Sequence, residues 1–116
     1  MGKFLISNRR NGEFQFSLKD QNGYEILGSE GYSTKIACIA IVELIKKNCG
    51  NNAMYDCQTS ADGKFYFHLR TGNGYRIATS EMFDSEKSRD NTIELIKNIA
   101  PDAMIDDQVV VKGVYK

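Results

Sequence analysis

Three side chains of one predicted strand have the chemical types needed to bind a base or an anion. Tyr66, His68 and Arg70 alternate with apolar residues, so an extended backbone places all three on the face opposite those residues. An aromatic ring, an imidazole and a guanidinium on one open sheet face could stack a base or hold an anion. A related segment earlier in the chain carries glutamine, serine and lysine there, which is typical of a solvated sheet face.

A serine followed by a glutamate occurs twice at equivalent places, as Ser29-Glu30 and Ser80-Glu81. One interpretation is a polar pair that the end of a strand presents to a ligand. The other is that both residues satisfy backbone groups where the chain turns from strand to helix. The second interpretation is favoured, because a structural need would act equally on both copies.

The residues that usually carry catalysis or metal binding are few. His68 is the only histidine, so a nucleophile has little choice of a base. Cys38, Cys49 and Cys57 form no C-x-x-C pair, and an odd count favours buried free thiols over a disulfide framework. No spacing of ligands typical of zinc is present in the sequence. We therefore expect no cofactor and no metal, and the sequence favours a non-catalytic protein over an enzyme.

The elements that must position these residues come from an internal repeat with an offset of 51 residues. Residues 12–50 align with residues 63–101, and the patterns Phe-x-Phe-x-Leu and Asn-Gly-Tyr-x-Ile recur in both. A period near 50 indicates one supersecondary unit per copy. Each copy is predicted to be three strands followed by a helix. Two copies are too few for a solenoid, so we expect them to share one core with pseudo-twofold symmetry.

Asn-Gly or Asp-Gly turns separate the strands, and each is predicted to close a three-residue loop with its glycine in the left-handed region. This loop length keeps Ile26 and Ile77 on the core face. The predicted pairs are Phe4–Leu18, Ile6–Phe16, Leu18–Ile26 and Phe16–Gly28, and in the second copy Tyr55–Leu69, Cys57–Phe67, Leu69–Ile77 and Phe67–Thr79. Cys57 is thus expected in the core, as the counterpart of Ile6.

Helices are predicted at about residues 34–47 and 85–98, with Ser33 and Asp84 as N-caps. We expect Phe16, Phe67 and the helix residues Ile45 and Ile96 to be buried. A last strand, extending through Gln108–Val111, is predicted to pair onto a sheet edge.

These residues resemble a bacterial family of small tandem-repeat proteins called YegP-like, DUF1508 or UPF0339. The matching motifs are Phe65–Arg70, Asn73–Ala78 and Ser80–Phe83, with counterparts in the first copy. The resemblance covers nearly the whole chain and implies an α+β fold of two βββα units. It implies no biochemical role. We expect one domain over residues 1–116, with repeat one at about 1–52, repeat two at about 53–103 and a C-terminal strand at about 104–116.

The outer face of the first helix differs from that of the second. Ile36, Ile39 and Ala40 cluster there, whereas the second helix has charged and polar residues. An apolar cluster with a charged rim is typical of a contact patch, which predicts a homodimer. The alternative is that the C-terminal strand covers the patch. The arc expected to face the sheet comprises Cys38, Ile41, Leu44, Ile45 and Cys49.

Composition narrows the function further. Fifteen basic and 15 acidic residues give a net charge of zero, so the chain lacks the footprint of a nucleic-acid binder. No apolar run spans a membrane and no signal peptide is recognised, so we expect a cytoplasmic protein. The favoured function is a non-catalytic binding or protein-interaction module for an unknown protein or small ligand. The alternatives are a nucleic-acid or anion-binding domain that uses the open sheet face, and a small enzyme of unknown reaction.

Overall fold

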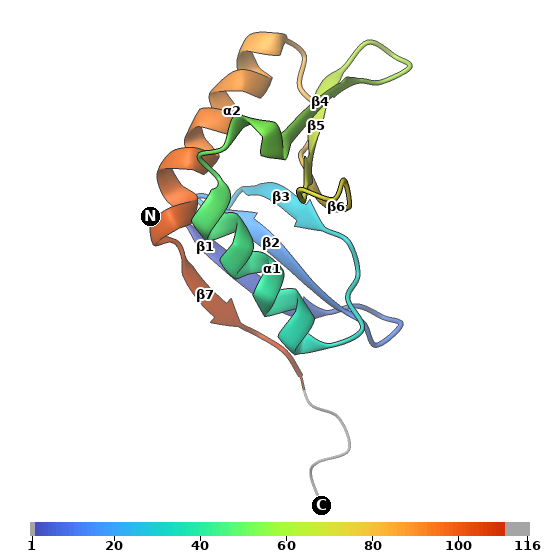
Figure 1. Cartoon of the computed structure of the whole chain (residues 1–116), viewed down its shortest axis with the longest axis vertical. Helices are drawn as coiled ribbons and strands as arrows, with labels where there is room; N and C mark the ends of the chain where they lie inside the picture. The colour runs from blue at the N-terminus through green and yellow to red at the C-terminus, as the bar shows by residue number, and fades with distance from the viewer. Residues whose placement is uncertain (1, 111–116) are drawn as a thin grey trace, which may run out of the picture.

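Three strands followed by a helix occur twice along the chain, and a further strand follows the second helix (Figure 1). The computed structural model describes residues 2–110. The strands are β1 (Lys3–Asn8), β2 (Phe14–Lys19), β3 (Glu25–Ser29), β4 (Tyr55–Thr59), β5 (Phe65–Arg70), β6 (Arg76–Thr79) and β7 (Met104–Asp107). The helices are α1 (Lys35–Asn48) and α2 (Glu86–Ile99), each followed by a short 3-10 turn, Asn52–Met54 or Ala100–Asp102. The predicted α+β fold of two βββα units is confirmed.

All these strands form one sheet in the order β4-β5-β6-β3-β2-β1-β7. The two copies meet at its centre, where β3 and β6 run antiparallel and Gly28 lies opposite Thr79. Positions 28 and 79 are equivalent in the repeat. The pseudo-twofold axis therefore passes through this pair.

The outer hairpins have the predicted register. β1 places Phe4 opposite Leu18 and Ile6 opposite Phe16, and β4 repeats this arrangement against β5. The turn glycines Gly12, Gly23, Gly63 and Gly74 have φ between 84° and 89°. This left-handed backbone closes the three-residue loops without the strain that a side chain would add.

The inner hairpins differ from the prediction by one residue. Their loops have the expected length, but Leu18 lies opposite Leu27, and Leu69 lies opposite Ala78. The register shifts between Leu18 and Lys19, and equally in the second copy. This shift is a β-bulge, in which two residues oppose one. It lets Ile26 and Leu27 both be buried, where a regular strand would bury only one.

Both helices begin one residue later than predicted. Thr34 caps α1 by accepting a hydrogen bond from the backbone N–H of Ala37 at 3.1 Å, and Ser85 caps α2 through Ser88 at 3.0 Å. The predicted caps Ser33 and Asp84 are thus wrong by one position. Each cap has a second polar residue beside it, so composition alone does not decide between them.

The core lies between one face of the sheet and both helices. Phe16, Phe67, Ile45 and Ile96 are at most 1% exposed, as predicted. Ring pairs repeat as well: Phe4–Phe16 and Tyr55–Phe67 both meet edge to face, with centroids 5.8 Å apart. The opposite face of the sheet carries no helix of the described chain (Figure 1).

The last strand begins at Met104 as predicted but ends earlier than predicted. β7 runs parallel to β1 and ends at Asp107, after which the N–H of Gln108 donates to the Ile6 carbonyl at 2.8 Å. The N–H of Val110 then donates to the side chain of Asn8, so the strand hydrogen bonding stops there. Val111 lies outside the described residues. No helix in the described part of the chain is long and apolar enough to cross a membrane.

Candidate functional site

The two copies differ most at the outer edges of the sheet. β7 covers the edge of β1, but in residues 2–110 no strand covers the equivalent edge of β4. Ile6 is completely buried, whereas its counterpart Cys57 is exposed. The prediction that Cys57 lies in the core is therefore wrong, because symmetry between the copies stops at this edge.

The backbone of β4 has hydrogen-bonding groups directed away from the sheet. Phe67, opposite Cys57, uses both of its backbone groups on the other side: its N–H donates to the Ser80 hydroxyl, and its carbonyl accepts from the Ser80 N–H. Neither group can therefore bond Cys57, whose own N–H and C=O face the open edge. Because alternate residues of a strand direct their backbone groups to the same side, the Tyr55 carbonyl and the Thr59 N–H also face the open edge.

A hollow of about 370 Å³ lies beside this edge, between β4 and α2. It is lined by Asn52, Tyr55, Cys57, Asp90, Ile93, Glu94 and Lys97. The floor is apolar, since it includes the buried Ile93 and the ring of Tyr55. The rim carries ion pairs: Lys97 contacts Glu94 at 3.3 Å, and Arg89 contacts Asp90 at 2.9 Å.

Repeat one shows what occupies the equivalent place. There Ile105 of β7 lies opposite Phe4 and packs against the core. Lys46 of α1 donates to the Ala103 carbonyl at 2.6 Å, and Lys35 forms an ion pair with Asp107. The hollow beside β4 is thus the counterpart of a space that an extended, hydrogen-bonded strand fills.

Tyr55 is held at the floor of the hollow. Its hydroxyl donates to the Cys49 carbonyl at 2.6 Å, and its ring lies under the Lys97 ammonium, 5.8 Å from it. Burial, followed by the nearby Cys49 and Glu94, raises the pKa of the Tyr55 hydroxyl. Tyr55 therefore remains neutral and fixed, and contributes a rigid apolar wall.

The predicted face of Tyr66, His68 and Arg70 is less open than expected. Tyr66 and His68 meet edge to face at 5.2 Å, and His68 is buried, with Nδ1 2.9 Å from the Thr79 hydroxyl. Arg70 donates to Asp56 at 2.6 Å and to the Gly74 carbonyl at 3.0 Å. The guanidinium is therefore engaged within the sheet, and its hydrogen bond lowers the pKa of the Asp56 carboxyl.

His68 gives a pH prediction. Burial, together with the charges of Arg76 and Arg70, lowers the pKa of His68 from its ordinary value near 6.5. Below that value the unfolded chain binds the proton more readily than the folded one, so stability falls as the pH drops. We expect thermal unfolding at pH 5 to occur at a lower temperature than at pH 7. Part of this difference should vanish in His68→Gln, and an NMR titration of His68 with a midpoint above 6.5 would contradict the prediction.

The repeated serines have the same contacts in both copies. The Ser29 hydroxyl accepts from the N–H of Phe16 at 2.8 Å and donates to the Glu30 carbonyl at 2.8 Å. Ser80 makes the same bonds with Phe67 and with the carbonyl of Glu81. The glutamates differ, since Glu30 forms an ion pair with Arg76 at 3.2 Å and Glu81 is exposed. These contacts agree with a structural role for both serines.

The predicted dimer patch is only partly exposed. Ile36 is 82% exposed and Ala40 is exposed, but Ile39 packs against the core. Val42 is fully buried and belongs to the inner arc, which is therefore wider than predicted.

Self-association through this patch stays a prediction: light scattering should show a dimer for the wild type and a monomer for Ile36→Lys.

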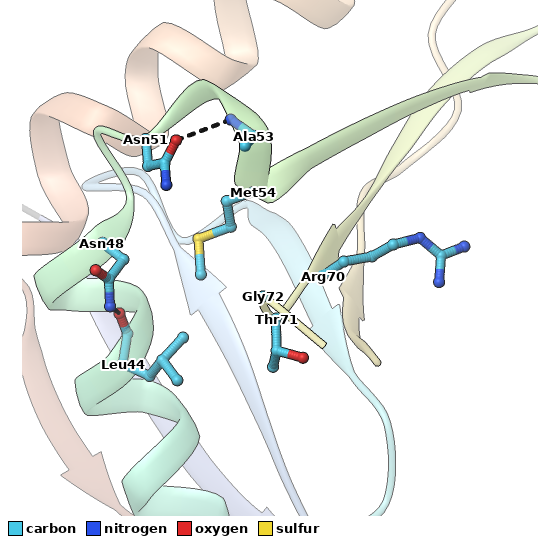
Figure 2. Close-up of a pocket in the computed structure, with 8 residues that line it drawn as sticks. All are labelled: Leu44, Asn48, Asn51, Ala53, Met54, Arg70, Thr71 and Gly72. Atoms are coloured by element: carbon cyan, nitrogen blue, oxygen red, sulfur yellow. Dashed lines mark hydrogen bonds between the residues drawn. The ribbon is translucent and has the colours of Figure 1, made fainter. Parts of the chain in front are cut away.

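Two further hollows lie where the copies meet, and they are related by the repeat. One, of about 270 Å³, joins the end of α1 to the β5–β6 turn and is lined by Leu44, Asn48 and Thr71 among others (Figure 2). Its counterpart of about 320 Å³ joins Leu95 and Ile99 of α2 to the β2–β3 turn. Figure 2 shows Arg70 directed away from the first hollow. The amide of Asn48 donates to the carbonyl of Leu44, and the guanidinium of Arg70, the charged group of this lining, is bound by Asp56.

The remaining thiols are buried. Burial raises the pKa of Cys38 to about 11 and also raises that of Cys49, so both stay protonated at neutral pH. Within residues 2–110, no three His, Cys, Asp or Glu side chains are grouped so as to hold a metal ion.

The fold and its repeats define a class of two-unit βββα proteins. A family model described as "Domain of unknown function (DUF1508)" matches residues 10–56 and 60–107. The chain therefore belongs to the DUF1508 family.

Similar proteins span the same length. A "UPF0339 protein in ptx operon 5'region" of Stutzerimonas stutzeri is 47% identical over 104 residues, which cover 90% of this chain and 94% of that protein. YegP of Escherichia coli is 33% identical over 96 residues, covering 83% and 87% of the two chains. A solution NMR structure of E. coli YegP has a TM-score of 0.89 at 30% identity and covers 96% of both chains. That of a UPF0339 protein from Shewanella oneidensis has the same score and identity, covering 99% and 98%.

Proposed function

We propose that this protein is a non-catalytic interaction module that binds an extended segment of another protein along β4. The observation that carries the proposal is the unequal edges of a symmetric sheet. β1 pairs with β7, whereas β4 presents the same backbone groups beside a hollow and pairs with no strand on that side within residues 2–110. A peptide added to such an edge gains main-chain hydrogen bonds, and pockets for alternate side chains supply specificity.

The open sheet face supports binding of nucleic acid less well. Arg70 is engaged by Asp56, and a lowered pKa leaves His68 neutral at neutral pH. Neither side chain therefore offers a free positive charge to a phosphate, which is the main source of affinity for single strands.

The experiment is an NMR titration with two seven-residue peptides. One has the sequence of residues 103–109, and the other is the same peptide with Asp107→Lys. At least one is expected to shift the amide signals of Cys57 and Thr59 and to slow their hydrogen exchange. If neither peptide changes these signals at millimolar concentration, the proposed function is wrong.

Proline at the edge provides the matched control. Cys57→Pro removes an N–H that bonds no other strand of residues 2–110, so the fold should tolerate it, whereas peptide binding should be lost. Cys57→Ser keeps the N–H and should bind as the wild type does. If Cys57→Pro unfolds, Thr59→Pro makes the same test, because the Thr59 N–H is the next one along β4 that faces the open edge. Undiminished binding by a folded proline variant would contradict the proposal.

A further inference from the structure

Repeat one also indicates which segment would fit the edge of β4. The interface between β7 and repeat one has three parts: a parallel direction, an apolar residue opposite the second residue of β1, and a charged residue two positions later. Each part has a counterpart in repeat two. Where the surrounding residues differ between the copies, the side chains that a partner needs should differ as well.

The first side-chain position is apolar in both copies. Ile105 lies opposite Phe4, and the equivalent place lies opposite Tyr55. On the helix side, Val42 corresponds to Ile93, and both are buried. A branched aliphatic side chain entering there would cover Ile93 and the ring of Tyr55, which together form the floor of the hollow.

The helix residue that faces the second position has opposite charge in the two copies. Asp107 lies opposite Ile6 and forms an ion pair with Lys35, the first residue of α1. The first residue of α2 is Glu86, the counterpart of Lys35. Asp90 of the hollow replaces Ile39 in the same part of the helix. An aspartate that suits repeat one would meet Glu86 in place of Lys35, beside Asp90, which pairs with Arg89.

We propose that β4 binds, in parallel orientation, an extended segment of a partner protein with a branched aliphatic residue followed two positions later by lysine or arginine. This inference rests on the proposed function and adds the partner's direction and charge. The aliphatic residue enters the hollow beside Tyr55, and the basic residue lies opposite Cys57, toward Glu86. Lys97, the counterpart of Lys46, lines the hollow with its ammonium on Glu94 and on the Asn52 side chain. On binding it would turn from these partners to the carbonyl that precedes the added strand, as Lys46 donates to Ala103.

The test compares the two peptides on a charge-reversed protein. The wild type should bind the Asp107→Lys peptide about fivefold more tightly than the unchanged peptide, the scale of one exposed ion pair. Glu86→Lys should reverse this preference. Glu43→Lys, the same charge change on α1, should leave it unaltered. High salt should reduce the preference, since exposed charges are screened.

Cys57 provides a second measurement. It is exposed, whereas Cys38 and Cys49 are buried, so a bound peptide should slow alkylation of Cys57 while the other thiols serve as an internal reference. If both peptides protect Cys57 equally and Glu86→Lys changes nothing, the charge rule is wrong while the strand-binding function stands. If neither protects, the function itself fails.

A second copy of this chain is the competing occupant. Light scattering without peptide should show no dimer that depends on residues 111–116. A dimer that disappears when those residues are deleted, and that protects Cys57, would overturn the choice of a separate partner.

Discussion

Replacing Phe16 or Phe67 with alanine is expected to lower the free energy of unfolding by about 3–5 kcal/mol. Both rings are at most 1% exposed, and each lies at the centre of its repeat against another ring. Truncation removes apolar area from the core and leaves a cavity that neighbouring side chains fill only in part. Urea unfolding followed by circular dichroism measures the loss.

Two exposed tyrosines make the matched control. Tyr24 and Tyr75 are repeat equivalents like the two phenylalanines, but they are 70% and 71% exposed. Their replacement by alanine should change the stability by less than about 0.5 kcal/mol. A loss below about 1 kcal/mol for either phenylalanine would mean that the strand register described above is wrong.

The second large effect is expected at Ser80. Its hydroxyl is the partner of the Phe67 N–H, and Ser80 is only 8% exposed. Ser80→Ala leaves that buried N–H without a hydrogen bond, which should cost about 1–3 kcal/mol. Ser29→Ala should act in the same direction through Phe16.

Hydrogen exchange separates this explanation from general destabilisation. In Ser80→Ala the exchange rate of the Phe67 amide should rise more than the rates of its neighbours in β5, because only the Phe67 amide loses its hydrogen bond. Ser33→Ala, at an exposed serine, should leave both stability and exchange nearly unchanged. Unaltered exchange at Phe67 in Ser80→Ala would show that the serine hydroxyl does not protect it.

Local signals in the sequence were sufficient for much of this fold. Loop length and the left-handed glycines follow from turn chemistry within a few residues, and the outer registers follow from alternation. The bulges at Ile26 and Ile77 could not be predicted in this way. They place two neighbouring residues of β3, and two of β6, in the core, which is a property of the assembled molecule.

The candidate site was missed for a related reason. The repeat predicts that Cys57 is buried like Ile6, and this would hold if each copy had its own outer strand. Only one such strand follows the repeats within the described chain, and it pairs with β1. Long-range packing decides whether this strand pairs with β1 or with β4. Beside β1, Asp107 meets Lys35, whereas beside β4 it would meet Glu86. The difference between these two helix-start residues was the signal that could have located the site.

The place of β7 also bears on how this sheet avoids uncontrolled growth. Its short length and its two aspartates are features that natural proteins use to discourage further pairing at an edge. Over residues 2–110 the sheet therefore has one receptive edge, β4, and one blunted edge, β7. Two copies that paired through their β4 edges would form a closed dimer, since β7 blunts the other edge of each sheet. Deleting β7 would expose the edge of β1 as well, and a sheet with two open edges can pair at both of them.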